Sequence, residues 1–444
     1  MEVTLIGTLV FALVIALATA LVHLFLWKRL VRDTTRPGRW RRVGTVAAVV
    51  LALTPPAGVA LTRMLPVDVA RWIAWPAFLW LALMFYLAVI LVVLEVPRLL
   101  VNLWWRRGER STRPAPVDSV RPTTVPAAVP SVTEESATEP ATPADPEPAT
   151  DPAEPEPSRP DGQAERRLNR RLFLARSAAL VTTVGAVGTV GYGMSNALGG
   201  PQITQVTVPL RRLHPDLTGL RIAVVSDIHL GPILGRGHTE RVVSRINELE
   251  PDLVAIVGDL VDGSVSQLGP AAAPLRDLSS RYGSFFVTGN HEYFSGVEPW
   301  LRELERLGVQ PLRNERVEIR QGAGVLDLAG VNDVTGAGQD DAPDFERALG
   351  GRDTSRPVVL MAHQPVQVAE AVRHGVDLQL SGHTHGGQLA PFNLLVRLQQ
   401  PVVAGLERID DTWLYVSRGA GFWGPPVRVG APPDITVVRL TPEQ

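Results

Sequence analysis

The sequence predicts an α/β domain in its C-terminal half, preceded by helices that are long and apolar enough to span a membrane. Two observations carry this prediction. The first 100 residues are mostly apolar, and almost no charge interrupts three long runs within them. From residue 220 to 383, short apolar runs typical of buried strands alternate with segments of helical spacing, which is the pattern of a sheet connected through helices.

Composition changes sharply along the 444 residues, so averages over the whole chain say little. The formal net charge of −2 gives no electrostatic argument for nucleic acid, which is not expected as a specific partner. The chain has no cysteine, which excludes disulfides, cysteine-ligated zinc and cysteine nucleophiles. Its length allows two or three domains.

A three-helix membrane region is predicted for residues 1–107, because about 20 apolar residues cross the hydrocarbon as a helix. The three apolar runs cover residues 5–27, 43–61 and 72–94. Pro55 and Pro56 interrupt the second run. A buried, soluble helical bundle is the alternative, and the lack of charge in these runs disfavours it.

Residues 108–165 are predicted to be a disordered linker, since Pro, Ala, Thr and acidic residues dominate and too little apolar surface remains to fold. Residues 166–200 then hold a fourth apolar run, 172–194. Four arginines precede this run: Arg166, Arg167, Arg170 and Arg171. They resemble a twin-arginine export signal, and an ordinary membrane helix with a basic flank is the other interpretation.

Basic residues gather in the segments after the first predicted helix, after the third and before the fourth. The first of these segments contains Lys28, Arg29, Arg32, Arg36, Arg39, Arg41 and Arg42. Because loops rich in Lys and Arg stay in the cytoplasm, all three segments are expected on that side. The sequence therefore predicts a multi-pass cell-membrane protein whose domain 201–444 lies outside the cytoplasm.

Within that domain, five apolar strands are predicted, and each ends in a polar residue. They read LRIAVVSD (220–227), DLVAIVGD (252–259), GSFFVTGN (283–290), RPVVLMAH (356–363) and VDLQLSGH (376–383). Residues 238–250 and 297–308 have the apolar spacing of helices. Ligand sites of open α/β sheets lie at the carboxyl ends of the strands, so these polar residues are expected to meet there.

The strand ends supply carboxylates, a carboxamide and imidazoles. The residues are Asp227, His229, Asp259, Asn290, His291, His363, His383 and His385. Such a mixed donor set suits Mn²⁺, Fe or Zn²⁺, and its size is sufficient for a pair of ions. Any one of these residues alone could be a core or turn residue, but their occurrence at five successive strand ends favours a site.

The pattern Asp-x-His, Gly-Asp, Gly-Asn-His-Glu, His and Gly-His-x-His resembles the calcineurin-like metallophosphoesterase superfamily over residues 203–441. The tail SRGAGFWGPPVRVGAPPDI further resembles the bacterial membrane-anchored branch of that superfamily. The resemblance implies a four-layer α/β/β/α sandwich built from two mixed sheets. It also implies two divalent metal ions and a phosphorylated small-molecule or lipid substrate.

The resemblance implies a role for each site residue. Asp227, His229 and His385 would hold one metal ion, and Asn290, His363 and His383 would hold the second. Asp259 would bridge both ions. His291 would protonate the leaving oxygen or steady the phosphate.

The expected function is that of a membrane-anchored, metal-dependent phosphodiesterase or phosphatase, with a lipid-linked or nucleotide-linked substrate among the candidates. A membrane sensor or scaffold with a non-catalytic metal-binding domain is the alternative, which predicts a lost ligand, and none is lost.

Three charged residues and one apolar segment outside the proposed ligand set also have expected roles. Glu292 is expected to orient His291 or its loop, and Asp262 to support a ligand; a structural role stays open for both. Arg418 is expected to be structural or on the surface. The apolar segment 388–406 either lines a groove for an acyl chain near the membrane or packs into the core of the domain.

Overall fold

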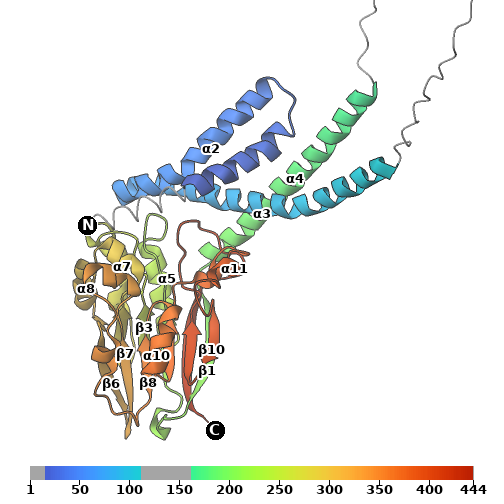
Figure 1. The fold of residues 1–444 in the computed structure, drawn as a ribbon. Coiled ribbons are helices and arrows are strands. Elements are labelled where there is room, and N and C mark those ends of the chain that lie inside the picture. The colour runs from blue at the N-terminus through green and yellow to red at the C-terminus, as the bar shows by residue number, and fades with distance from the viewer. Residues whose placement is uncertain (1–15, 112–161, 444) are drawn as a thin grey trace, which may run out of the picture.

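The computed structural model describes residues 16–111 and 162–443 of the chain (Figure 1). Residues 112–161, which make up most of the predicted linker, lie outside the described residues, as does the start of the first predicted membrane helix. The described residues form a helical region and an α/β domain.

The helical region contains long helices where the sequence predicts membrane spans. Residues 16–26 are helical and continue into η1 (Trp27–Arg32). The other helices are α2 (Arg39–Met64), α3 (Val67–Ser111) and α4 (Gly162–Leu198). In the described part of the chain, three stretches are long and apolar enough to cross a membrane: Arg39–Thr62, Val67–Pro97 and Leu168–Leu198. These stretches contain the second, third and fourth predicted runs, and α2 continues through Pro55 and Pro56.

Small residues let these helices approach one another. A Cβ on Gly58 of α2 would lie 2.3 Å from the Cβ of Ala77 on α3, so only glycine fits this contact. Ala82 of α3 and Ala186 of α4 are fully buried in a cluster that joins those two helices. The helices are therefore held together by close packing of small side chains, as is usual for helices in lipid.

Two six-stranded mixed sheets make up the domain. The first has the order β1 (Gln202–Leu210), β12 (Asp434–Pro442), β2 (Arg221–Val225), β3 (Leu253–Val257), β4 (Ser284–Val287) and β5 (Val309–Pro311). The second has the order β10 (Gly405–Ile409), β11 (Thr412–Val416), β9 (Leu378–Ser381), β8 (Val358–Met361), β7 (Gly324–Gly330) and β6 (Glu315–Gln321). The pairs β12–β2, β6–β7 and β10–β11 are antiparallel, and the other pairs are parallel.

Helices cover the outer faces of both sheets. Helices α5 (Arg236–Asn247), α6 (Val265–Ala272) and α8 (Val297–Arg306) pack on the first sheet, and α9 (Phe345–Leu349) and α10 (Val368–Arg373) pack on the second. The inner faces share one core, in which Val224 and Val257 of the first sheet meet Leu328 and Leu380 of the second. The order helix, sheet, sheet, helix confirms the predicted four-layer sandwich.

The remaining elements are short. They are α7 (Asn290–Ser295), α11 (Asn393–Val396), and the 3₁₀ turns η2 (Pro215–Leu217), η3 (Ala273–Asp277), η4 (Val334–Gln339), η5 (Pro365–Gln367) and η6 (His385–Gly387). Among them, α7 and η6 follow directly on strands β4 and β9 and carry polar residues of the predicted site.

The domain is attached to α4 by side-chain and backbone contacts as well as by the chain itself. The backbone N–H of Arg428 donates to the carbonyl of Gly193 at 2.9 Å, and Asn196 Nδ2 donates to the carbonyl of Arg428 at 3.2 Å. A Cβ at position 193 would lie 2.4 Å from Val427 Cγ1, so glycine permits this approach. Val427 belongs to the same buried cluster as α3 and α4, so the domain packs onto the helices.

Candidate metal centre

The eight predicted site residues lie together at the carboxyl ends of five strands. Asp227 and His229 follow β2, and Asp259 follows β3. Asn290 and His291 begin α7 directly after β4, His363 follows β8, and His383 and His385 follow β9. Within this set, three groups have donor atoms all within 4.8 Å of one another: Asp227, His229 and His385; His229, Asp259 and His291; Asp259, His363 and His383.

The first group places two imidazoles face to face beside a carboxylate. His229 Nε2 lies 3.0 Å from His385 Nε2, and Asp227 Oδ1 lies 3.3 Å from His385 Nε2. Asp227 is fully buried. Three donor atoms converge here away from water, which is the arrangement that a divalent cation requires.

The third group, Asp259, His363 and His383, contains a buried nitrogen that no protein group satisfies. His363 Nδ1 donates its proton to the carbonyl of Val257 at 2.8 Å, which leaves Nε2 with a free lone pair. Nε2 is buried, has no hydrogen-bond partner and lies 3.2 Å from Asp259 Oδ2. An unsatisfied buried acceptor costs about 1–3 kcal/mol, and a cation bound there would remove that cost. His383 Nδ1 lies 2.9 Å from Asn290 Oδ1 and completes this side of the site.

Asp259 connects the groups. Its Oδ2 lies 3.2 Å from His363 Nε2, 3.8 Å from His229 Nε2 and 3.9 Å from His291 Nε2. It is the only carboxylate that belongs to two of the three groups found among the described residues. This central position is the one that a bridging carboxylate occupies, and the donor set fits two divalent cations.

The backbone at the site is strained. Asp227, His229, Asp259, His383 and His385 all have positive φ, at 51°, 48°, 51°, 71° and 52°. Non-glycine residues rarely adopt this region, and each instance costs on the order of 1–3 kcal/mol. Strain concentrated on five proposed ligands indicates that the strand-end loops are shaped for a site rather than for stability.

Asp262 contacts two histidines of the site. Its Oδ1 lies 3.0 Å from His229 Nδ1 and 2.6 Å from His291 Nδ1. Burial raises the pKa of the Asp262 carboxyl, but the two imidazoles outweigh burial and hold that pKa below its usual range. Burial lowers the pKa of His291, whereas Asp262 and Asp259 raise it to about 9. Asp262 therefore lies where it was expected, beside a proposed ligand.

Glu292 ties two loops of the site together. Its fully buried carboxylate accepts the backbone N–H groups of Asp259 at 3.0 Å, Leu260 at 2.8 Å and Gly289 at 2.7 Å. Burial, and then the charge of Asp259, raise its pKa to about 7. Glu292 was expected to orient either His291 or its loop. In the structure it contacts the backbone of the loops and not the His291 side chain.

Two arginines near the site have structural contacts. Arg418 donates to Asp434 Oδ2 at 3.0 Å, which agrees with the structural role expected for it. Arg428, which sequence reasoning did not single out, is fully buried and donates to the carbonyls of His385 at 3.2 Å and Arg418 at 2.7 Å. Burial lowers its pKa to about 10. The only signal in the sequence was that residues 419–433 contain no other charged residue.

Two exposed aromatic residues flank His291 and were also missed. Its ring centroid lies 5.7 Å from that of Phe294 and 5.9 Å from that of Trp423. Phe294 is 67% exposed and Trp423 is 55% exposed. They form an apolar rim beside the metal centre.

The apolar segment 388–406 divides into two parts. Gln400, Val402 and Val403 are buried, as packing into the core predicts. Phe392, Leu394, Leu395 and Leu398 are instead exposed, so that interpretation is wrong for residues 392–398.

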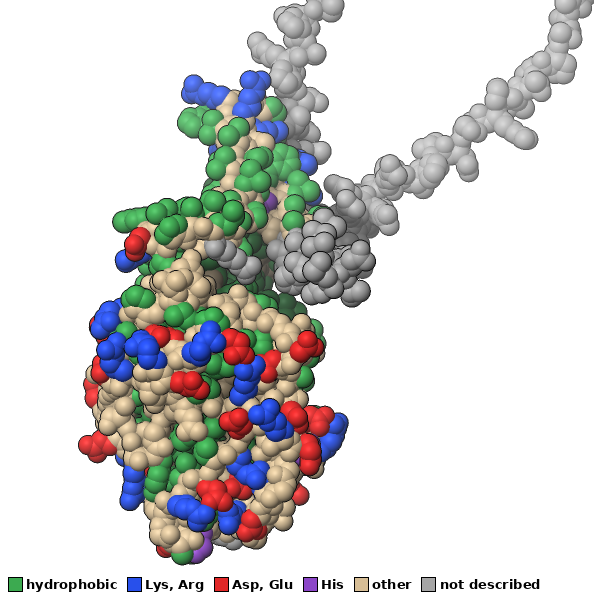
Figure 2. Space-filling view, turned by 90° about the vertical axis from the view of Figure 1, so that its left-hand side faces the viewer, with side chains coloured by type: hydrophobic (Ala, Val, Ile, Leu, Met, Phe, Trp, Pro, Cys, Tyr) green, Lys and Arg blue, Asp and Glu red, His purple; other side chains and the backbone are tan. Residues whose placement is uncertain are grey.

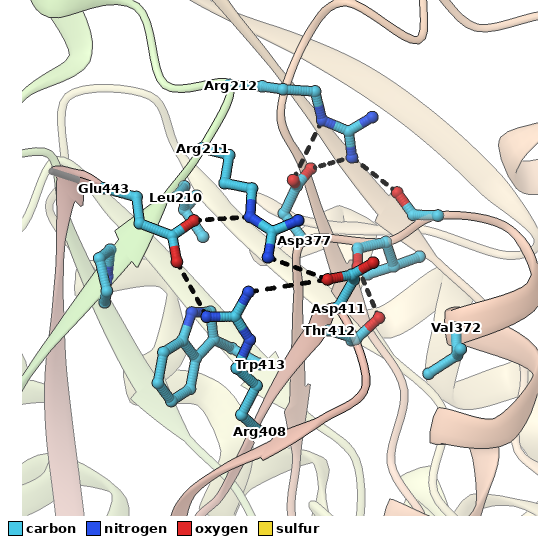
Figure 3. A pocket seen from close by; sticks show the side chains of 13 residues that line it. Leu210, Arg211, Arg212, Val372, Asp377, Arg408, Asp411, Thr412, Trp413 and Glu443 are labelled. Atoms are coloured by element: carbon cyan, nitrogen blue, oxygen red, sulfur yellow. Dashed lines mark hydrogen bonds and ion pairs between the residues drawn. The ribbon is translucent and has the colours of Figure 1, made fainter.

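A separate cleft of about 310 Å³ lies at the other end of the sheets (Figure 3). Asp377 lines it and precedes β9, whereas His383 follows β9. Its arginines are paired: Arg211 with Glu443 at 2.8 Å, and Arg212 with Asp377 at 2.8 Å. Carboxylates of the domain itself thus neutralise these two arginines.

Comparisons with known proteins agree with this geometry. The sequence profile of the calcineurin-like phosphoesterase family matches residues 220–387, which include all eight site residues. A Bos taurus protein named transmembrane protein with metallophosphoesterase domain is 42% identical over 296 residues, 63% of this chain and 66% of its own length. The chain thus spans just under two thirds of that relative.

This chain covers a larger share of a bacterial relative than of the Bos taurus protein. A Helicobacter pylori protein named as an uncharacterized metallophosphoesterase is 39% identical over 278 residues, 62% of this chain and 73% of its own length. Among solved structures, a dimetal phosphatase from Danio rerio matches with a TM-score of 0.35 and 14% identity, covering 50% of this chain and 93% of its own.

Proposed function

Because the chain belongs to the calcineurin-like phosphoesterase family, we propose that it is a metal-dependent phosphoesterase that works at a membrane surface. It hydrolyses phosphoric ester or anhydride bonds, as a phosphodiesterase or a phosphatase, in a lipid-linked or nucleotide-linked substrate. The observation that supports this most strongly is the cluster of seven Asp and His side chains, which Asn290 joins through His383. Asp259 lies at its centre, and the lone pair of His363 Nε2 is unsatisfied.

The site residues divide into holders of metal and one proton donor. Asp227, His229 and His385 would hold one cation; Asn290, His363 and His383 would hold the other, with Asp259 shared. Two divalent cations of Mn, Fe or Zn would activate water and neutralise charge on the phosphoryl group. His291, held by Asp262 at 2.6 Å, would give a proton to the leaving oxygen.

The orientation that we propose places the domain outside the cytoplasm, in a multi-pass protein. The basic segment after the first helix contacts α3 and α4 near one end of their apolar stretches, Val67–Pro97 and Leu168–Leu198: Arg29 pairs with Glu95 at 2.8 Å, and Arg36 donates to Asn169 at 2.9 Å. The domain contacts the opposite end of α4, at Gly193. Figure 2 shows Lys and Arg side chains gathered at the end of the helices farthest from the domain, which supports this orientation.

The test is hydrolysis by the full chain purified in detergent, after metal removal and reloading with Mn²⁺, Fe²⁺ or Zn²⁺. The panel contains nitrophenyl phosphate, bis-nitrophenyl phosphate, phospholipids and nucleotide-sugar anhydrides, with Asp259→Asn as the inactive control. We expect metal-dependent release of product from at least one class. A metal-loaded protein that hydrolyses none of them would support the sensor or scaffold alternative instead.

A further inference from the structure

Resting on the proposed phosphoesterase activity, we propose that residues 391–398 insert into the surface of the bilayer that the chain's own helices span. The metal centre would then take its phosphoester or pyrophosphate from a lipid that remains in that bilayer. The partner that covers the apolar segment 391–398 is the lipid leaflet next to the domain.

The segment 391–398 is apolar and faces outward. Phe392 is 46% exposed, Leu394 62%, Leu395 57% and Leu398 83%. Helix α11, which lies within it, has no buried residue. Four large apolar side chains on one short segment are costly in water and are typical of a surface that another apolar phase covers. Arg397 between them matches the mixture of cation and apolar residues found on interfacial segments.

This segment is continuous with the membrane helices. Leu389, two residues before it, packs against the cluster that joins α3 and α4 and pairs with Val429. Figure 1 shows α11 beside the lower end of α4. Tyr192, near that end of α4, is 60% exposed, as an aromatic residue at the membrane boundary would be. The segment therefore starts at the depth where α4 leaves the hydrocarbon, which selects the bilayer as its partner.

The same segment is also continuous with the metal centre. It begins six residues after His385. Gln388 Nε2 donates to the carbonyl of Trp423 at 3.0 Å, and the Trp423 ring lies 5.9 Å from that of His291. One short stretch of chain therefore connects the proposed ligand, the apolar rim and the exposed leucines. A phosphate at the metal centre would have its acyl part directed towards the bilayer.

The chemistry is hydrolysis in the membrane interface. Water adds to phosphorus, the bond from phosphorus to the leaving oxygen breaks, and that oxygen takes up a proton. No oxidant or further reactant is needed.

The first experiment compares two kinds of substrate with the full chain in nanodiscs. The variant Phe392→Ser/Leu395→Ser/Leu398→Ser is matched with Phe392→Leu/Leu395→Met/Leu398→Met, which keeps the segment apolar. A lipid phosphomonoester, a lipid phosphodiester and a lipid pyrophosphate are placed in the disc, and nitrophenyl esters are supplied in solution. We expect the serine variant to lose about tenfold or more on lipid and less than about twofold on the soluble esters, with the apolar variant unchanged.

The second experiment measures depth without activity. Because the chain has no cysteine, Leu398→Cys can carry a single fluorophore, with Ala323→Cys in the β6–β7 turn as the control away from the metal centre. Spin-labelled lipid should quench the label at 398 and not at 323. Absence of quenching at 398, equal losses on both substrates, or hydrolysis of soluble esters alone by the unaltered chain would each overturn the inference. If the unaltered chain hydrolyses none of the substrates, the result would instead count against the proposed phosphoesterase activity.

Discussion

His363 and His229, two of the proposed metal ligands, are each held in one orientation by a contact through Nδ1. The Nδ1 proton of His363 is directed to the carbonyl of Val257, and Nδ1 of His229 faces Asp262, so each ring presents Nε2 to the interior of the site. Such outer contacts fix the tautomer and the direction of an imidazole. The strained backbone at the strand ends is therefore accompanied by fixed imidazole orientations, which would lower the entropic cost of binding the proposed metal ions.

Asp259→Asn is expected to abolish most binding of both metal ions. A shared carboxylate neutralises two cations, and the amide removes that charge while two cations remain close to each other. Elemental analysis of the purified chain checks this, with Asp353→Asn in an exposed turn as the control. An Asp259→Asn protein with its full metal content would show that Asp259 is not the bridge.

His291→Ala is expected to keep both metals and to slow turnover by about 10²–10⁴ on substrates with basic leaving groups, which is the usual worth of a general acid. The loss should shrink on nitrophenyl esters, whose leaving group needs little protonation. Metal content and turnover on both ester types are measured together. A lost metal ion would make His291 a ligand, and equal losses on both ester types would place its action on the phosphoryl group.

The eight site residues could be found from the sequence because each follows an apolar strand or an adjacent turn, and their individual roles stay predictions. Arg428 and Trp423 could not be found in this way. Arg428 contacts backbone carbonyls such as that of His385, 43 positions away. Because every residue has a backbone carbonyl, such partners cannot be recognised from residue types. Trp423 meets His291 only through the fold.

At the level of elements, the segment 425–431 connects the end of α4 to the loop after β9. Arg428 makes that connection through hydrogen bonds. Its backbone N–H donates to the carbonyl of Gly193, its carbonyl accepts from Asn196, and its guanidinium donates to the carbonyl of His385. A guanidinium is stable when fully buried only if its donors are satisfied, as they are here. The position of His385, a proposed ligand, thus depends on contacts that reach α4.

Arg428→Met is expected to lower metal content and thermal stability together, because it leaves several buried carbonyls without donors at about 1–3 kcal/mol each. Arg428→Lys should recover only part of the loss, since an ammonium group cannot reproduce the planar fork. Melting temperature and metal content of both variants are compared in detergent. Unchanged values in Arg428→Met would mean that the carbonyls find other donors.

The strands that sequence analysis found are those with uninterrupted apolar runs. Strands β3 and β8 are fully buried, and their sequences show it. Seven strands were not predicted. Of these, β1, β5, β6 and β10 lie at sheet edges, and the mixed exposure of β1, β6 and β10 gives alternating polar residues and a weaker signal. Strands β7, β11 and β12 were missed as well, although most of their residues are buried. The helices α5 and α8, expected at 238–250 and 297–308, are confirmed.

At the scale of the whole molecule, the charges of the helical region and the position of the domain agree. The arginines at residues 29–42 lie at one end of the helices, and the domain packs at the other end, near Gly193. The apolar helix surfaces and the charged domain surface are visible side by side in Figure 2. The molecule thus has one basic end and one α/β end, separated by about the length of a membrane helix.

Reporter fusions test this orientation. A fusion at residue 140 is expected to be active only with a reporter that works in the cytoplasm, and a fusion after residue 444 only with one that works outside it. The reason is the excess of arginine in the three segments predicted to stay inside. A C-terminal reporter active in the cytoplasm would reverse the proposed orientation.

The contact of Val427, Leu389 and Val429 with the membrane helices has a consequence for how the molecule can be divided. Cutting the chain before β1 would leave those three side chains in water and would remove the partners of Arg428 on α4. An isolated domain would then expose an apolar surface formed by Val427, Leu389 and Val429. The nearby His385 would also be held less firmly, because Arg428 would lose its contacts with α4. Preparations of the isolated domain should self-associate and hold metal more weakly than the intact chain, so activity measured on such a fragment would be a lower bound.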